Sequence, residues 1–154
     1  MNDQASLYER LGGREKLAQL LRHFYADVRQ HKLLGPLFAE HIHDWPKHLE
    51  LIADFWSTIA GGPPVYAGRM PVKHVPLGLR EEHFTAWLGL WEHHCKAWLT
   101  PECAAELIQL AHTVAARLRI ICGVTSPTGS DFAFAPRSYG SPLKPFTVAI
   151  PKPV

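Results

Sequence analysis

A histidine between two prolines is the residue of this chain best placed to bind a metal. His74 lies in the stretch RMPVKHVPL, residues 69–77. Pro71 and Pro76 each fix φ and lack a backbone N–H, so the stretch predicts a loop or a short turn rather than a long helix. A neutral imidazole is a common metal ligand, but a loop histidine is also an ordinary solvated side chain. The stretch alone leaves both interpretations open.

Three further side chains with polar tips fall on helical faces that the sequence predicts to be buried. Tyr25 lies on one such face, about one turn past Leu21, and Trp87 lies at the centre of another. His48 shares a third face with Ile52, one helical turn away. A buried hydroxyl, imidazole or indole N–H needs a hydrogen-bond partner, and each one alone is usually a satisfied core group. Together they predict polar groups that converge on a ligand inside an apolar pocket.

A haem group would suit such a pocket, because it needs a strong axial ligand, flat apolar walls and cations near its propionates. His74 is the candidate axial ligand, and the flanking Arg69 and Lys73 are the candidate cations. Tyr25 and Trp87 could hold a diatomic ligand that takes up partial negative charge, through hydrogen bonds of about 1–3 kcal/mol each. The candidate wall residues are Phe38, Ile52, Phe55, Trp56 and Leu88.

A zinc site is the competing hypothesis for a chain with ten histidines. Its candidate ligands are His41, His43, His48, His74, His93, His94 and Cys95. No pair of them has the H-x-x-x-H or C-x-x-C spacing that favours a tetrahedral site, and the adjacent His93 and His94 should point to different sides of a helix. We therefore favour haem over zinc. The histidines expected to be solvated are His23, His31, His41, His43, His83, His93, His94 and His112.

Length, composition and charge indicate a single globular domain without a polyanionic partner. The chain has 154 residues, of which 47% are hydrophobic and 19% charged, and its net charge is +2 with neutral histidines. No run of Lys and Arg suggests nucleic-acid binding, and no apolar run reaches about 18 residues, so no membrane span is expected. The first residues lack the basic and apolar regions of a signal peptide. Three cysteines without a C-x-x-C pair fit a reduced cytoplasmic protein, which we expect to be a monomer.

Four main helices should position these side chains, and no pair of strands is indicated. Apolar residues recur at helical spacing in four segments, and turn signals separate them. Asp44 suits the N-cap of the second helix, and Thr100 suits that of the fourth, which should end at Gly123. We expect a connector at residues 35–38 and a loop at residues 63–79. The predicted helices cover about residues 14–31, 44–60, 80–98 and 100–123.

The character of the chain changes after Gly123. Residues 124–154 contain six of the 13 prolines together with scattered glycine and serine, and they carry three basic residues against one acidic residue. Such a composition predicts an extended or disordered segment. We therefore divide the chain into a helical domain, residues 1–123, and a Pro-rich tail, residues 124–154.

A series of short segments occurs in the order and at the separations of a known family. The segments are Phe24-Tyr25, GPLF at 35–38, HLELIADFW at 48–56, Tyr66-Ala67-Gly68, Lys73-His74 and HFTAWL at 83–88. With them the chain resembles the truncated haemoglobins, and most closely their third group, from about residue 14 to residue 122. The stretch at residues 7–13 looks more like other truncated groups, and the tail has no counterpart that we recognise.

The resemblance implies an all-α, truncated globin-like fold, a two-over-two helical sandwich around haem b. It implies that His74 is the proximal iron ligand and that Tyr25 and Trp87 are distal hydrogen-bond donors. His48 would occupy the distal histidine position as a gate or secondary contact, and Phe38 would pack on the porphyrin. The other residues implied to contact the cofactor or wall its pocket are Phe24, Ile52, Phe55, Trp56, Tyr66, Arg69, Lys73 and Leu88.

The family suggests a protein that binds O₂, and also NO and CO, at ferrous iron in a bacterial cytoplasm. A Tyr/Trp pair of donors typically slows ligand release, which suits NO or reactive-oxygen chemistry better than simple O₂ transport. A peroxidase-like or NO-dioxygenating enzyme, served by a reductase, would need the same pocket, so the sequence does not separate the two. A cofactor-free helical interaction module is a third hypothesis, and it predicts no Soret band after addition of haemin.

Overall fold

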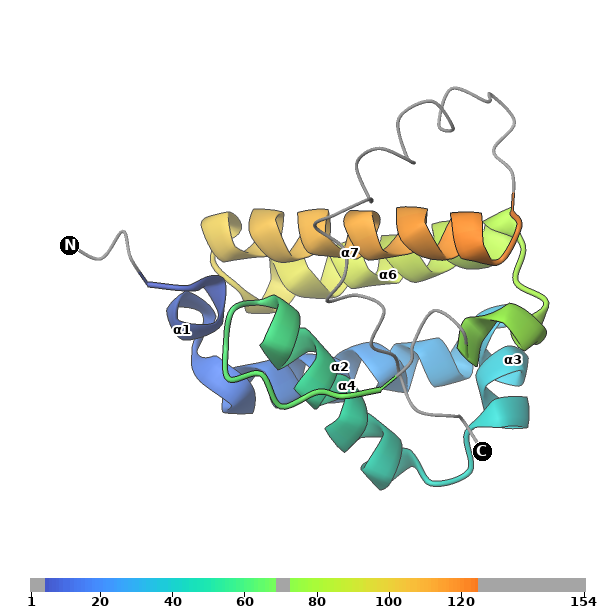
Figure 1. The fold of residues 1–154 in the computed structure, drawn as a ribbon, viewed down its shortest axis with the longest axis horizontal. Helices are drawn as coiled ribbons and strands as arrows, with labels where there is room; N and C mark the ends of the chain where they lie inside the picture. The colour runs from blue at the N-terminus through green and yellow to red at the C-terminus, as the bar shows by residue number, and fades with distance from the viewer. Residues whose placement is uncertain (1–4, 69–72, 125–154) are drawn as a thin grey trace.

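The computed structural model describes residues 5–68 and 73–124, and every regular element in those ranges is helical, as the sequence predicts (Figure 1). The helices are α1 (Leu7–Leu11), α2 (Gly13–Gln30), α3 (Leu34–His41), α4 (Trp45–Ile59), α6 (Glu81–Trp98) and α7 (Pro101–Ile121), with a 3₁₀ turn at Val75–Leu77.

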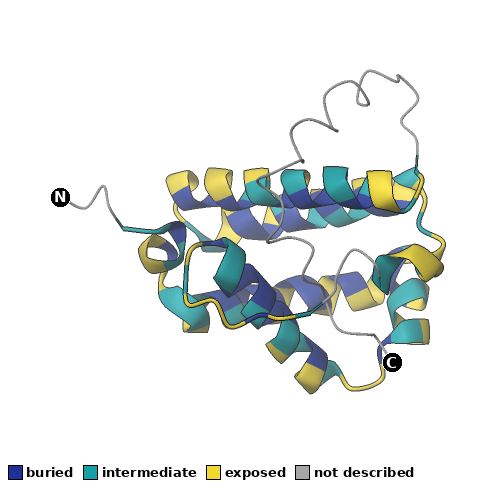
Figure 2. Ribbon diagram, viewed as in Figure 1, coloured by how far each residue is buried: buried dark blue, intermediate teal, exposed yellow. Residues whose placement is uncertain are grey.

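Two pairs of helices pack across each other as a sandwich. α6 and α7 lie side by side as one layer, and α2 packs against α4 in the other (Figure 1). α2 also contacts α6 and thereby joins the layers. The buried faces of these helices turn toward the space between the layers (Figure 2). Each of the four helices contributes a fully or almost fully buried side chain to the core: Phe24, Ile52, Trp91 and Leu107.

Capping residues determine where two of the predicted helices begin. The Asp44 carboxylate accepts a hydrogen bond from the Lys47 N–H at 3.1 Å at the start of α4. The Thr100 hydroxyl accepts one from the Cys103 N–H at 3.3 Å at the start of α7. Each bond satisfies an N–H that lacks an intrahelical acceptor, and a cap of this kind contributes about 1 kcal/mol. Both predicted N-caps are therefore confirmed.

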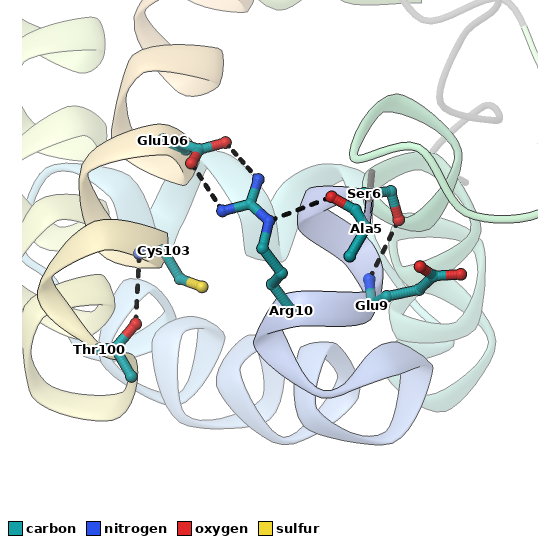
Figure 3. A network of polar contacts seen from close by, with 7 residues as sticks. All are labelled: Ala5, Ser6, Glu9, Arg10, Thr100, Cys103 and Glu106. Atoms are coloured by element: carbon teal, nitrogen blue, oxygen red, sulfur yellow. Dashed lines mark hydrogen bonds and ion pairs between the residues drawn. The ribbon is translucent and has the colours of Figure 1, made fainter. Parts of the chain in front are cut away.

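The apolar periodicity of the sequence does not reveal α1, because five residues are too few to show a helical period. Ser6 caps this helix by accepting a hydrogen bond from a backbone N–H of its first turn at 3.1 Å. Arg10 reaches α7, where its two terminal nitrogens donate to both carboxylate oxygens of Glu106 at 2.8 Å (Figure 3). Leu7 and Leu11 are buried against the core. Tertiary contacts therefore hold α1 in place.

The segment expected to be a connector is helix α3, so that prediction was wrong. Pro36 lies in its first turn, where a missing N–H breaks no intrahelical bond. Gly35 allows α3 to start close to the end of α2, because a Cβ at this position would lie 2.6 Å from the Arg29 carbonyl oxygen. A Gly-Pro pair marks a tight junction between two helices here, and the same pair also marks irregular loops.

His74 lies in a helical turn rather than in an irregular loop. Its backbone is in the right-handed helical region (φ −84°, ψ −18°), and the 3₁₀ turn follows directly. Gly78, at φ +70°, then redirects the chain toward α6. Residues 69–72 and 125–154 lie outside the described part of the chain. The predicted tail and the domain boundary at residue 123 therefore stay predictions.

Candidate functional site

A cavity lies between the two layers and is open to solvent on one side. Side chains from α2, α3, α4, α6, α7 and the turn at His74 line it. Most of this lining is apolar, which is typical of a site for a cofactor or small molecule. The polar or polar-tipped side chains in it are Tyr25, His41, His48, Trp56, Lys73, His74, His83 and Trp87.

The cavity brings together most of the residues predicted from the sequence. His74 lies on the turn after residue 73, while Tyr25, His48 and Trp87 come from three different helices. These four residues, which span 62 positions of the chain from Tyr25 to Trp87, thus meet at one space. The predicted residues that line the cavity are Tyr25, Phe38, His48, Ile52, Phe55, Trp56, Lys73, His74 and Trp87.

Three of the predicted cofactor contacts are not part of the cavity lining. Within the described part of the chain, the lining excludes Phe24, Tyr66 and Leu88, all of which are buried in the core. Phe24 packs edge-on against Tyr25, with ring centroids 4.7 Å apart, and Tyr66 packs edge-on against Phe55 at 5.4 Å. These side chains support lining residues instead of forming the surface. Periodicity places a residue on the inner side of a helix, but it does not say which neighbour that side meets.

The Tyr25 hydroxyl and the Trp87 indole interact at the cavity. Burial raises the pKa of Tyr25, and a hydrogen bond with the Trp87 side chain opposes this effect. The indole N–H is a donor only, so it donates to the Tyr25 hydroxyl oxygen. Tyr25 therefore stays protonated, and its hydroxyl keeps its own hydrogen to donate. The pair supplies a buried donor beside apolar walls.

His48 is a buried imidazole that stays neutral near pH 7. It lies on α4 and is 8% exposed. Burial, and second the charge of His74, lower the pKa of His48 to about 4. Both imidazoles line the same cavity, so the charge of His74 acts on His48. Its ring packs edge-on against Trp45, with centroids 5.6 Å apart.

Two histidines expected at the solvated surface line the cavity instead. His41 holds its Nδ1 3.0 Å from the Leu37 carbonyl oxygen, so Nδ1 is the donor and Nε2 carries no hydrogen in the neutral ring. His83 accepts a hydrogen bond at Nδ1 from the Arg80 N–H at 2.9 Å. Burial is the first cause that lowers the pKa of His83. The available signal for His83 was its position three residues after the N-cap of α6, where a side chain can bond back to the cap.

His94 is also buried, although it was expected at the surface. Its Nε2 lies 2.7 Å from the Asp27 carboxylate, on the face of α6 that packs against α2. The adjacent His93 is exposed, and the two rings are perpendicular, as expected for neighbours on a helix. Among the described residues, no three His, Cys, Asp or Glu side chains are grouped to hold a metal ion.

Comparison with known proteins identifies the family. The family model for bacterial-like globins matches residues 6–117. The chain belongs to this family. A relative, the Group 3 truncated hemoglobin ctb of Campylobacter jejuni, is 31% identical to this globin over 110 residues, which cover 68% of this chain and 87% of the relative. The Group 2 truncated hemoglobin YjbI of Bacillus subtilis is 31% identical over 86 residues, covering 53% of this chain and 62% of the relative.

Solved structures show the same fold. The crystal structure of group III truncated hemoglobin from Campylobacter jejuni matches this globin with a TM-score of 0.68 at 30% identity, covering 71% of this chain and 91% of the other. The 2/2 hemoglobin from Synechococcus, a structure with covalently attached heme, matches with a TM-score of 0.67 at 22% identity, covering 77% and 99%. The predicted resemblance and the two-over-two sandwich are confirmed, and this chain is a globin of the haem-binding kind. None of its described helices has the length and apolar character needed to cross a membrane.

Proposed function

We propose that this globin binds haem b, with His74 as the ligand of the iron. The ferrous iron would then bind O₂, NO or CO at the coordination position that no residue occupies. The observation that carries the proposal is a single cavity that contains His74 together with Tyr25, His48 and Trp87 in otherwise apolar walls. A neutral imidazole is a common axial ligand of haem iron, and an apolar cavity suits a flat macrocycle. The residues present therefore fit the cofactor that the family implies.

The walls and rim of the cavity supply the cofactor's other contacts. Aromatic rings from three helices face the same space as His74, and they offer flat apolar surface. They are Phe38, Phe55, Trp56 and Phe84. Lys73 lies next to His74 in the lining and would meet a propionate, as would Arg69, which lies outside the described residues. Four fixed rings and a rim cation would hold the macrocycle in one orientation.

Tyr25 and Trp87 act on the gas ligand by hydrogen bonding. The Tyr25 hydroxyl is buried and protonated, so it donates to a ligand that takes up partial negative charge. A hydrogen bond to such a group is worth about 1.5–3 kcal/mol and strengthens in a site from which water is excluded. His48 stays neutral and buried on the same side of α4 as Ile52, which limits the entry of water. Slow ligand release follows, which suits NO or reactive-oxygen chemistry.

Reconstitution with haemin tests the ligand assignment. The parent protein should show a Soret band, and His74→Gly should lose or strongly weaken it, with partial recovery when imidazole is added. His41→Gly is the matched control, because it removes another imidazole from the same cavity and should retain the band. An unchanged Soret band in His74→Gly would overturn the assignment, and the absence of a band in the parent protein would favour a cofactor-free interaction module.

An enzymatic role is the second candidate, as a peroxidase-like or NO-dioxygenating protein supplied by a reductase. The observation that favours peroxide chemistry is a stack of tryptophan rings that starts at the cavity. Consumption of peroxide or NO with an added reductant distinguishes turnover from simple binding. We place the protein in a reducing cytoplasm, because its three cysteines are free. We also propose that it is a monomer.

A further inference from the structure

Three indole rings form a compact stack that begins at the cavity. Trp56 and Trp87 line the cavity, and their rings are nearly parallel at 15° with centroids 6.4 Å apart. Trp91 packs behind them and is 1% exposed. Its ring lies 4.5 Å from that of Trp56 and 5.4 Å from that of Trp87, with interplanar angles of 22° and 7°. Parallel rings at these separations allow their π systems to overlap.

The series continues along α6 toward the surface. Trp87, Trp91 and Trp98 lie close to one face of this helix, at spacings of four and seven residues. At 1.5 Å per residue, the step from Trp91 to Trp98 rises about 10.5 Å along the helix axis. Trp98 is half-buried and stacks on the exposed His23, with centroids 4.2 Å apart. A path of aromatic rings thus leads from the cavity to the solvent.

Indole is among the side chains that are most easily oxidised by one electron, and overlapping rings share the resulting positive charge. We propose that Trp87, Trp91 and Trp98 form an electron relay that carries oxidising equivalents from the cavity to the protein surface. The substrates at the outer end are one-electron donors of the phenol class, which are oxidised at Trp98 without entering the cavity. This relay rests on the haem-binding function proposed above.

The electron balance uses hydrogen peroxide as the oxidant. Peroxide takes up two electrons and two protons and leaves as two water molecules. Bound haem would supply one of these electrons, and the Trp87 indole supplies the other and becomes a radical cation. Trp91 then reduces Trp87, and Trp98 reduces Trp91. A phenol reduces the Trp98 radical cation, gives its hydroxyl proton to water and leaves as a phenoxyl radical. A second phenol would return the electron that haem supplied, and the two phenol protons balance the two that peroxide takes up.

The surroundings of the rings favour outward movement of the charge. The Trp91 indole N–H donates to the Leu107 carbonyl oxygen at 3.2 Å, and a carbonyl does not accept the proton, so an oxidised Trp91 keeps its positive charge. A charge is costly in the core and less costly near water, which draws it toward the half-buried Trp98. The carboxylate of Asp27, 2.7 Å from the His94 ring between these two tryptophans on α6, adds negative charge near this path.

Spin trapping on the ferric holoprotein tests the relay. The protein is first shown to have a Soret band, then treated with hydrogen peroxide and a nitroso spin trap, and the adducts are located by peptide mass spectrometry. Freeze-quench electron paramagnetic resonance records the radical in parallel. The parent should carry an adduct on Trp98, and Trp91→Phe should lose it. Trp98→Phe alters only a half-buried ring, so it should retain the Soret band and shift the adduct inward to Trp91 or Trp87.

Trp45→Phe is the matched control, because Trp45 packs near the cavity against Tyr25, at 5.8 Å, but lies outside the stack. This variant should keep the Trp98 adduct. If the Soret band is present and peroxide is consumed while Trp98 stays unlabelled, or while Trp91→Phe leaves the label in place, the relay is refuted and the haem site is not. If the Soret band is absent, the proposed function itself fails, and the relay fails with it.

Discussion

Replacing His48 by glutamine should make the haem-free protein less sensitive to acid. Burial first, and the charge of His74 second, lower the pKa of His48 in the folded protein to about 4. The same side chain in an unfolded chain titrates near pH 6.5. The unfolded chain therefore binds this proton more readily than the folded protein. The destabilising effect begins as the pH falls through about 6.5, and it is complete once the pH falls below about 4.

The magnitude follows from the interval between these two pKa values. Within it, each pH unit removes up to about 1.36 kcal/mol of folding free energy. Lowering the pH from 7.5 to 5 therefore destabilises the folded protein through His48 by about 2 kcal/mol. Glutamine has a polar side chain that does not titrate, so His48→Gln removes this contribution. Titrating groups that do not interact with His48 are common to both proteins and cancel in the comparison. His74 interacts with His48, so its own titration also changes in the variant and adds to the measured difference.

Urea denaturation of the haem-free proteins, followed by circular dichroism at both pH values, measures the effect. The parent should lose about 2 kcal/mol more than His48→Gln on acidification. His93→Gln controls for the removal of one imidazole, because His93 is exposed on α6. Equal losses in the parent and in His48→Gln would refute the conclusion that His48 is a buried, neutral group at the cavity.

Two further predictions address the cavity donors and the helix junction. Tyr25→Phe should raise the O₂ dissociation rate of the ferrous holoprotein by about 10- to 100-fold, because a hydrogen bond of about 1.5–3 kcal/mol is lost. Unchanged stopped-flow rates in both this variant and Trp87→Phe would contradict the donor pair. Gly35→Ala should destabilise the protein by about 1–3 kcal/mol, because its Cβ would lie 2.6 Å from the Arg29 carbonyl oxygen. The Cβ added by Gly89→Ala enters open space on α6, so this control variant should stabilise the protein by about 0.5–1 kcal/mol. Equal changes in the free energy of unfolding for the two variants, measured by urea denaturation, would refute the proposed clash at Gly35.

The sequence predicted those features that depend on the spacing of residues along a single helix. The apolar stripes identified four of the helices, because a buried face recurs every three to four residues. Asp44 and Thr100 marked helix starts, because a cap needs only a side-chain acceptor and a nearby backbone N–H. Tyr25 and His48 were predicted to face inward for the same reason, and both are buried. Each of these features depends on residues within a few positions of one another.

The partners of each buried face were decided by the tertiary structure alone. α1 and α3 are short and owe their positions to contacts with other helices, so local periodicity does not reveal them. Phe24 and Tyr25 are adjacent on α2 and both buried, yet only Tyr25 lines the cavity.

The histidines also show which features depended on the tertiary structure. His41 and His83 line the cavity and His94 pairs with Asp27. The local sequence does not distinguish His41 and His94 from solvated histidines, and for His83 it offers only the position three residues after the N-cap of α6. The sequence by itself determined the helices and the inward-facing side chains, because these follow from the helical repeat. Which of those side chains share one cavity was decided only when α2, α4, α6 and α7 packed, because the direction in which each face points depends on its neighbours.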